Sequence, residues 1–261
     1  MPSSRRHSGK RSIAISSSHR ERTAAPLRGM KGRARVAVFA SGGGSNLGAI
    51  LAHGERLGSS RAADVALVAS GRESSGALGR ARERGIPSAV LGGLDPQAMN
   101  ALLDEHRIDL VVLAGYLSLV PDVVTARFAG RMLNVHPALL PAFGGHGLYG
   151  QRVHRAVLDA GAKLSGATVH FVDAQYDRGP IIAQWPVPVR SEDTPESLAA
   201  RVLRIEHMLL PRALEAVARG SVTLGADGRV HGVCAPPEAS AYSLSTQDDA
   251  SLASEIDALF A

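Results

Sequence analysis

Apolar segments alternate with amphipathic segments along most of the chain. Short apolar runs, which predict β-strands, occupy residues 34–40, 65–70, 88–91, 110–114 and 132–135. The spacing of apolar residues predicts helices between them, at residues 46–57, 76–84, 96–106 and 122–128. Residues 110–114 are apolar at every position, as expected of a strand covered on both faces. Strands and helices that alternate in this way predict an α/β domain with a doubly wound, mostly parallel sheet.

The pattern changes after residue 140. A Gly-rich loop at residues 144–150 precedes a predicted helix at 151–160, and strands are predicted at 165–172 and 181–189. Residues 225–228 predict a hairpin turn. Thr194 is the expected N-cap of a long helix that starts at Pro195 and ends near residue 218. The expected architecture is a single domain with a long C-terminal helix.

The net charge of +5 is unevenly distributed. Residues 1–35 hold ten Lys or Arg and one acid, Glu21, so the remaining residues carry a net charge of −4. A mildly acidic body disfavours a nucleic-acid partner. Residues 1–32 are poor in apolar side chains, and we expect a disordered basic leader there. Its composition is that of an organellar transit peptide, but we favour the alternative that translation starts at Met30.

The expected folded domain covers residues 33–235, and a weakly ordered tail covers residues 236–261. The single cysteine, Cys234, excludes an internal disulfide and a multi-cysteine metal site, and it fits a reducing, cytoplasmic location. No apolar run has the length of a membrane span, so no membrane partner is expected. We expect a monomer or a homodimer.

Polar clusters follow three of the predicted strands, at residues 41–46, 115–118 and 134–136. Ligands of doubly wound sheets bind beyond the carboxyl ends of the strands, so the clusters predict one common site. Residues 41–46 read Ser-Gly-Gly-Gly-Ser-Asn, and glycines before a helix N-terminus suit a phosphate group. The loop is neither a dinucleotide fingerprint nor a Walker motif. The alternative is a tight turn in which Ser45 caps the helix.

Asn134 and His136 are two residues apart, so both point to the same face of an extended strand. A hydrogen-bond donor beside a proton carrier suits attack on a carbonyl group. His170 and Asp177 are candidate partners, and Asp177 is placed to orient His136. The structural alternatives are that Asn134 closes a strand end, His136 is a buried structural histidine and Asp177 starts a turn. The ten histidines form no paired ligand motif, so no metal is expected.

Taken together, these segments resemble the folate-dependent formyltransferase family. The resemblance runs from about residue 35 to about residue 211 and rests on residues 41–47 (SGGGSNL), 113–117 (LAGYL), 133–141 (LNVHPALLP), 166–172 (GATVHFV), 177–181 (DRGPI) and 206–207 (EH). Its most specific part is Asn-x-His-Pro followed by a distal Asp-x-Gly-Pro. It implies a Rossmann-like formyltransferase fold and formyl transfer from 10-formyltetrahydrofolate, a co-substrate, to the amine of glycinamide ribonucleotide in purine (IMP) biosynthesis.

The resemblance also implies roles for individual residues. Asn134 would bond the developing oxyanion, His136 would pass a proton to the leaving folate nitrogen, and Asp177 would orient His136 directly or through water. The acceptor phosphate would be held by Gly44, Ser45 and Asn46, and its ribose by Glu206. The folate groove would be lined by Leu117, Ser118, Leu119, Val120, Asn134, Val172 and Asp173. Residues 142–150 would form a mobile lid.

The chain departs from the family pattern at Ser118, where an arginine is frequent, and at Gly43, where an asparagine is frequent. Other formyl acceptors are alternatives. A methionyl-tRNA formyltransferase is disfavoured by the acidic body, and a formyltetrahydrofolate deformylase, whose acceptor is water, by the short polar leader. A non-catalytic folate- or nucleotide-binding module is disfavoured because Asn134, His136 and Asp177 occur together.

Overall fold

The computed structural model describes residues 32–93, 95–232, 249–258 and 260. The leader up to residue 31, Cys234 and residues 236–248 of the expected tail lie outside these ranges. The division of the chain at residues 33 and 235 therefore stays a prediction.

The centre of the fold is a seven-stranded sheet of order β3-β2-β1-β4-β5-β6-β7. Its strands are β1 Ala34–Phe39, β2 Ala63–Ser70, β3 Ser88–Val90, β4 Leu110–Leu113, β5 Met132–His136, β6 Leu164–Phe171 and β7 Ile181–Pro188. The pairs from β3 to β5 are parallel, whereas β6 and β7 join antiparallel to β5 and to each other. The predicted α/β class with a mostly parallel sheet is confirmed.

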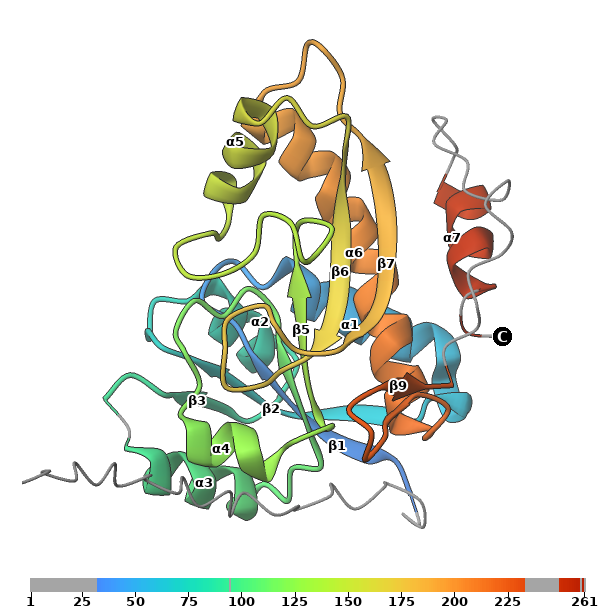
Figure 1. Ribbon diagram of the computed structural model, residues 1–261. Coiled ribbons are helices and arrows are strands. Elements are labelled where there is room, and N and C mark those ends of the chain that lie inside the picture. The colour runs from blue at the N-terminus through green and yellow to red at the C-terminus, as the bar shows by residue number, and fades with distance from the viewer. Residues whose placement is uncertain (1–31, 94, 233–248, 259, 261) are drawn as a thin grey trace, which may run out of the picture.

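Helices connect the strands and cover both faces of the sheet (Figure 1). They are α1 Ser45–Leu57, α2 Gly76–Glu83, α3 Pro96–Glu105, α4 Asp122–Arg127, α5 Gln151–Asp159 and α6 Pro195–Ala218, with a 3₁₀ turn, η1, at Gly58–Ser60. The long C-terminal helix is α6, where Thr194 and Ser197 form a capping box. A hairpin of β8 Thr223–Leu224 and β9 Val230–His231 forms at the predicted turn.

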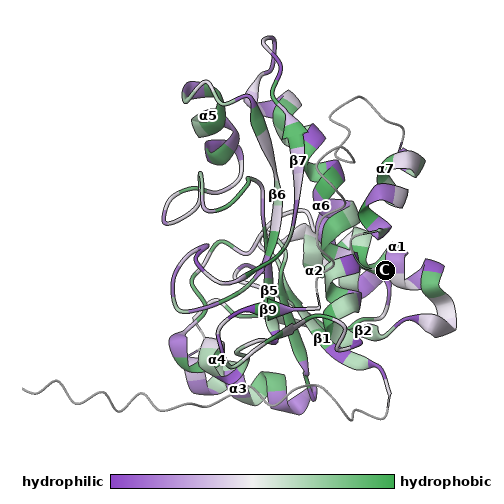
Figure 2. Ribbon diagram, turned by 45° about the vertical axis from the view of Figure 1, so that its right-hand side comes forward, coloured by the Kyte–Doolittle hydropathy of each residue, from purple (hydrophilic) through white to green (hydrophobic). Residues whose placement is uncertain are grey.

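The side chains of each central strand divide between two hydrophobic clusters. Along β1, Val36 and Val38 face a cluster with α1, α2 and α6, while Ala37 and Phe39 face one with α3 and α4. Figure 2 shows hydrophobic residues along the strands and a mixture of hydrophobic and hydrophilic residues on α3 and α6. This pattern explains why β4 is apolar at every position: all four of its residues are buried.

Two local features could not be anticipated from the sequence: the cap of α1 and a helix near the C-terminus. Ser45 is not the cap of α1; Gly44 is the N-cap, in a left-handed conformation with φ 72°, and no side chain caps the helix. Within the expected weak tail, residues Asp249–Asp257 form helix α7, whose Ile256 is buried. Asp257 of α7 pairs with the buried Arg212 of α6. None of the described helices is long and apolar enough to cross a membrane.

Candidate active site

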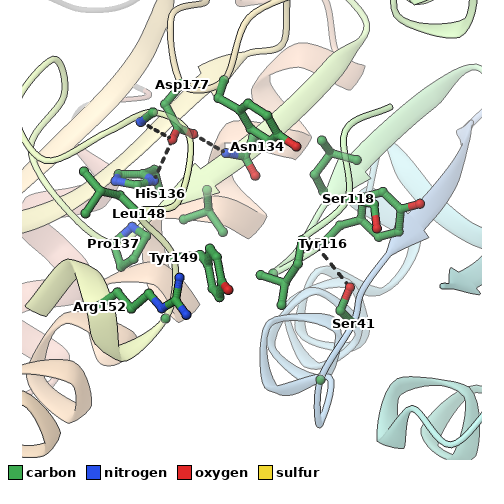
Figure 3. Close-up of a pocket in the computed structure, with 18 of the residues that line it drawn as sticks. Ser41, Tyr116, Ser118, Asn134, His136, Pro137, Leu148, Tyr149, Arg152 and Asp177 are labelled. Atoms are coloured by element: carbon green, nitrogen blue, oxygen red, sulfur yellow. Dashed lines mark hydrogen bonds and ion pairs between the residues drawn. The ribbon is translucent and has the colours of Figure 1, made fainter. Parts of the chain in front are cut away.

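A cavity of about 820 Å³ lies where the loops after β1, β4 and β5 meet. The predicted polar clusters reach it through Ser41 and Gly42, residues 115–120, and residues 134–137. Its other walls come from residues 145–154, the segment after β6, and the face of α6 that carries Glu206. Ser41 ties two of these loops together, because its Oγ accepts a hydrogen bond from the Leu117 backbone N–H at 3.1 Å. Figure 3 shows this bond and the residues around the opening.

Asn134, His136 and Asp177 come together at one end of this cavity (Figure 3). Asp177 contacts both of the others: its Oδ2 lies 3.4 Å from Nδ1 of His136, and its Oδ1 accepts from Nδ2 of Asn134 at 3.3 Å. Asp177 therefore faces both side chains at contact distance. Asn134 and His136 lie on the same face of β5, as their spacing predicts.

The turn that carries Asp177 holds its carboxylate rigidly. Asp177 has a left-handed backbone with φ 54°, a conformation that aspartate tolerates better than most residues. Its Oδ2 also accepts from the Gly145 N–H at 2.9 Å. Burial alone would raise the pKa of Asp177, but hydrogen bonding to His136 and to the Gly145 N–H holds that pKa well below its usual range. Asp177 is consequently a carboxylate at neutral pH.

The ring of His136 is almost fully buried and has an acceptor at each nitrogen. Nε2 lies 2.8 Å from the carbonyl oxygen of Phe143, and Nδ1 faces the Asp177 carboxylate. Both partners only accept hydrogen bonds, so the doubly protonated, cationic ring satisfies both contacts at once. The Gly-rich loop thus closes over the histidine that we predict to transfer a proton.

His170 sets the direction of the Asn134 amide. Its Nδ1 donates to the Phe171 carbonyl at 2.7 Å, which leaves Nε2 to accept from Asn134 Nδ2 at 3.0 Å. The amide nitrogen of Asn134 then has partners in both His170 and Asp177. The predicted donation to an oxyanion requires Asn134 to exchange one of these two bonds for the substrate oxygen.

Thr168, on β6 beside His170, anchors the chain that follows His136. Its hydroxyl donates to the Ala138 carbonyl at 2.6 Å and accepts from the Leu140 N–H at 3.0 Å. Gln184 on β7 reinforces this anchor, because its amide donates to both Thr168 Oγ1 and the Leu140 carbonyl. The Asn-x-His-Pro segment is therefore fixed from a neighbouring strand.

The Gly-rich loop after β1 has its carbonyl groups occupied on the α2 side. The carbonyls of Ser41, Gly42 and Gly43 accept from Arg72, Ser75 and Arg80, respectively. A Cβ at Gly44 would lie 2.8 Å from the Cα of Ala77, so this position also requires glycine on steric grounds. The first turn of α1 leaves N–H groups without intrahelical partners, as an anion site needs.

Asn46 and Glu206 form a buried pair beside this loop. Nδ2 of Asn46 donates to Oε2 of Glu206 at 2.7 Å, and Oδ1 of Asn46 is buried without a partner within the described chain. Burial raises the pKa of Glu206 to about 7. Glu206 lines the cavity, whereas Gly44, Ser45 and Asn46 are not among its lining residues in the described chain. The structure thus places one of the four predicted acceptor residues, Glu206, on the cavity wall, with Asn46 bonded to it from behind the loop.

All predicted folate-groove residues line the cavity, including Ser118 and Asp173. Leu117 and Leu119 are half exposed at 47% and 48%, which leaves apolar surface for a ligand ring. Tyr116 and Tyr176 also line the cavity, and Tyr176 makes an edge-to-face contact with His146 of the Gly-rich loop. The loop and the Asp177 segment therefore touch each other across the cavity.

Sequence reasoning missed three lining residues of the loop and α5: Tyr149, Arg152 and His154. Burial lowers the pKa of His154 to about 4, so its ring is neutral at pH 7. The sequence signal was present, since Tyr149, Arg152 and His154 follow the Gly-rich loop at the start of an amphipathic helix. Among the described residues, no group of three or more His, Cys, Asp or Glu side chains is arranged to hold a metal ion.

Comparison with known proteins identifies the class. Residues 34–214 match the family model described as formyl transferase, and the chain belongs to this family. It is 44% identical over 204 residues to a chloroplastic phosphoribosylglycinamide formyltransferase of Arabidopsis thaliana, an alignment that covers 75% of this chain and 69% of that protein. The trifunctional purine biosynthetic protein adenosine-3 of Bos taurus is 39% identical over 205 residues, which are 76% of this chain but 20% of that protein.

A solved structure gives the same assignment. Glycinamide ribonucleotide transformylase 1 from Symbiobacterium toebii superimposes with a TM-score of 0.69 at 38% sequence identity, and covers 77% of this chain and 94% of that one. The predicted family and its fold are confirmed.

Proposed function

We propose that this chain transfers a formyl group from 10-formyltetrahydrofolate to the amine of N1-(5-phosphoribosyl)glycinamide, a step of purine biosynthesis. The observation that carries the proposal is the Asp177 carboxylate, which contacts both His136 and Asn134. The cavity around them is also lined by the start of the Gly-rich loop after β1 and by Glu206. A cavity of about 820 Å³ lies within the range of small-molecule sites.

The chemistry needs charge stabilisation and one moving proton. The neutral amine attacks the formyl carbon, and the carbonyl oxygen gains negative charge. Asn134 donates a hydrogen bond to that oxygen. His136 delivers a proton to the folate nitrogen as the bond between that nitrogen and the formyl carbon breaks, and the proton that the attacking amine loses restores the cationic ring of His136. Asp177 stabilises the cationic ring of His136 before the transfer.

The two substrates enter from different walls. The phosphate of the acceptor binds at Gly44, Ser45 and Asn46, and its ribose at Glu206. The pterin lies between Leu117–Val120 and the segment of Val172 and Asp173, which all line the cavity. Ser118 offers a hydroxyl and not the arginine that is frequent in relatives, so this groove holds the folate with less positive charge.

The test is an assay of formyl transfer by the full-length chain. 10-Formyltetrahydrofolate is supplied with glycinamide ribonucleotide, with charged methionyl-tRNA, or with water alone, and the formylated products are separated. We expect product with glycinamide ribonucleotide only. Equal consumption of folate in water alone would identify a deformylase, and formyl-methionyl-tRNA would identify the tRNA enzyme. Folate binding without turnover would leave a binding module. His106→Ala, at the C-cap of α3 and outside the cavity lining, is the control for His136→Ala.

Location and assembly complete the proposal. A cytoplasmic location is inferred from the single cysteine, although the relative from Arabidopsis thaliana is named as chloroplastic. A monomer or a homodimer is the proposed assembly. Fractionation with a compartment marker and sedimentation equilibrium test these two points.

A further inference from the structure

A pair of side chains on one wall of the cavity has no part in the function proposed above. Tyr149 lies near the end of the Gly-rich loop of residues 144–150, and Arg152 lies in the first turn of α5. The Cζ atom of Arg152 lies over the Tyr149 ring, 4.8 Å from its centroid. Both residues are exposed and both line the cavity. A guanidinium stacked on a ring keeps its N–H edge available for an anion.

The backbone fixes this pair before any ligand arrives. Gly150, the N-cap of α5, has φ 53° and ψ −135°, which favours glycine. The Arg152 N–H donates to the Tyr149 carbonyl at 3.2 Å and closes the turn. Tyr149 and Arg152, three residues apart, are thereby held side by side at the start of the helix. In the part of the chain that the structure describes, the guanidinium forms no hydrogen bond or ion pair.

The pair lies on the cavity wall that α5 and α6 form, across the opening from Ser41 at the start of the predicted phosphate loop. Figure 3 shows Tyr149 and Arg152 at one edge, Ser41 across the opening, and Asp177 and Asn134 at the opposite end. α5 packs on α6, and Ala199, Ala200 and Leu203 line the cavity one to two turns before Glu206. Ser118 and the predicted folate wall lie across the cavity from Arg152.

We propose that Arg152, stacked on Tyr149, is the cationic residue that binds the phosphate of the formyl acceptor. The proposal rests on the proposed function, and it adds a charge partner to a phosphate site built from backbone N–H groups. A planar guanidinium offers two parallel N–H groups to a phosphate. The other arginine among the cavity-lining residues of the described chain, Arg72, is engaged with the Ser41 carbonyl at 3.1 Å. Arg72 thus holds the loop of residues 41–46 after β1, whereas the N–H edge of the Arg152 guanidinium is open to an anion.

The experiment compares Arg152→Gln with Arg155→Gln. Arg155 is an exposed arginine of the same helix that does not line the cavity. In Arg152→Gln the KM for glycinamide ribonucleotide should rise about ten- to a hundred-fold, as expected for the loss of one charge-assisted contact, with the KM for formyl folate unchanged. Arg155→Gln should change neither value. With the dephosphorylated acceptor, ribosylglycinamide, wild type and Arg152→Gln should have the same KM.

Two further variants separate stacking from charge. Tyr149→Leu removes the ring beneath the guanidinium and should raise the KM for the phosphorylated acceptor less than Arg152→Gln does. Arg152→Lys keeps the charge but loses the planar fork, and should recover part of the affinity. An unchanged KM for the phosphorylated acceptor in Arg152→Gln overturns the proposal. So does an equal rise for the dephosphorylated acceptor or for the folate.

A binding measurement keeps this test independent of the reaction. Ribose 5-phosphate is titrated calorimetrically into wild type and Arg152→Gln, and the wild type should bind about ten-fold more tightly or better. Should the transfer assay give no product, the proposed function fails, and this titration still decides the role of Arg152. Equal affinity, or no binding to the wild type, overturns the proposal.

Discussion

The backbone carbonyl oxygen of Phe143 accepts a hydrogen bond from Nε2 of His136 at 2.8 Å. With the second ring nitrogen facing Asp177, this contact occupies the last free position of the imidazole. Phe143 has φ 56°, an uncommon conformation for an aromatic residue, which costs about 1–3 kcal/mol. Nε2 of His136 reaches the leaving nitrogen of a substrate only when it exchanges the Phe143 carbonyl for that nitrogen.

Replacement of His136 by alanine should remove the proton carrier and leave the substrate sites in place. We expect kcat to fall about 10²- to 10⁴-fold, the usual range for a general acid, with nearly normal binding of glycinamide ribonucleotide. Steady-state kinetics and calorimetric titration measure the two quantities. An unchanged kcat would remove His136 from the mechanism.

Asp177→Asn should keep the shape of the turn and remove the charge. The pKa of Asp177 lies well below its usual range because the folded chain surrounds it with His136, His170 and the Gly145 N–H. Without the carboxylate, the cationic form of His136 loses its counter-charge, and we expect kcat to fall on the order of 10²-fold. Asp227→Asn, in the exposed β8–β9 hairpin, is the matched control.

Gly144→Ala tests the contact between the Gly-rich loop and the catalytic turn. A Cβ at residue 144 would lie 2.4 Å from Cδ2 of Leu140 and 3.1 Å from Cβ of Asp177. Displacement of either neighbour should lower kcat and cost about 1–3 kcal/mol of unfolding free energy, measured by urea denaturation. Gly79→Ala in α2 has no atom within 4 Å of its new Cβ and should be neutral or stabilising by about 0.5–1 kcal/mol. Equal effects of the two changes would contradict the prediction.

Substitution of Asn46 tests the acceptor site. Asn46→Ala removes the hydrogen-bond donor to Glu206 and leaves the buried carboxyl group without that partner. The change should lower the free energy of unfolding by about 1–3 kcal/mol. We expect the KM for the phosphorylated acceptor to rise by about ten-fold or more and the folate KM to stay the same. Ser45 substitutions should act in the same direction. A change in the folate KM alone would mean that this loop binds the folate and not the acceptor. Asn100→Ala on α3 is the control for the loss of an amide side chain.

The elements of the fold were predictable because their signals are local. The five-residue apolar run at 110–114 and the two-residue spacing of Asn134 and His136 each fix a strand and its faces. Contacts between distant residues had no such signal. The pairing of Asp177 with His136 was one of several possibilities that the residues left open until the family resemblance favoured it, and the contact from the Phe143 carbonyl depends on a backbone conformation that side-chain identities do not encode.

Individual surface residues were the hardest to predict. A single arginine on an amphipathic helix is most often a solvated side chain, so Arg152 gave no signal by itself. Its role emerges only when α5 is placed against α6 and the Tyr149 ring lies under its guanidinium. The alternative that Ser45 caps α1 was wrong for a related reason. Ser45 has the chemistry of a cap, but the packing of Ala77 against the turn requires glycine at residue 44.

The pair of Glu206 and Asn46 predicts a pH-dependent stability with a definite sign. Burial raises the pKa of Glu206 to about 7, above its value in an unfolded chain, so the folded state keeps a proton that the unfolded state releases. This contribution to stability is complete below about pH 4.5 and is lost as the pH rises through about 7. The shift corresponds to about 3 kcal/mol at most.

Glu206→Gln should remove this pH dependence, because glutamine is neutral at every pH and its Oε1 still accepts from Asn46. The free energy of unfolding is measured by urea denaturation of both proteins at pH 5 and pH 8. We expect the variant to gain stability relative to the wild type on going from pH 5 to pH 8. The neutral rings of His53 and His154 act in both proteins and cancel in the comparison. An equal pH dependence in the two proteins would mean that Glu206 is ionised throughout this range, and that the acceptor site carries a buried charge before substrate binds.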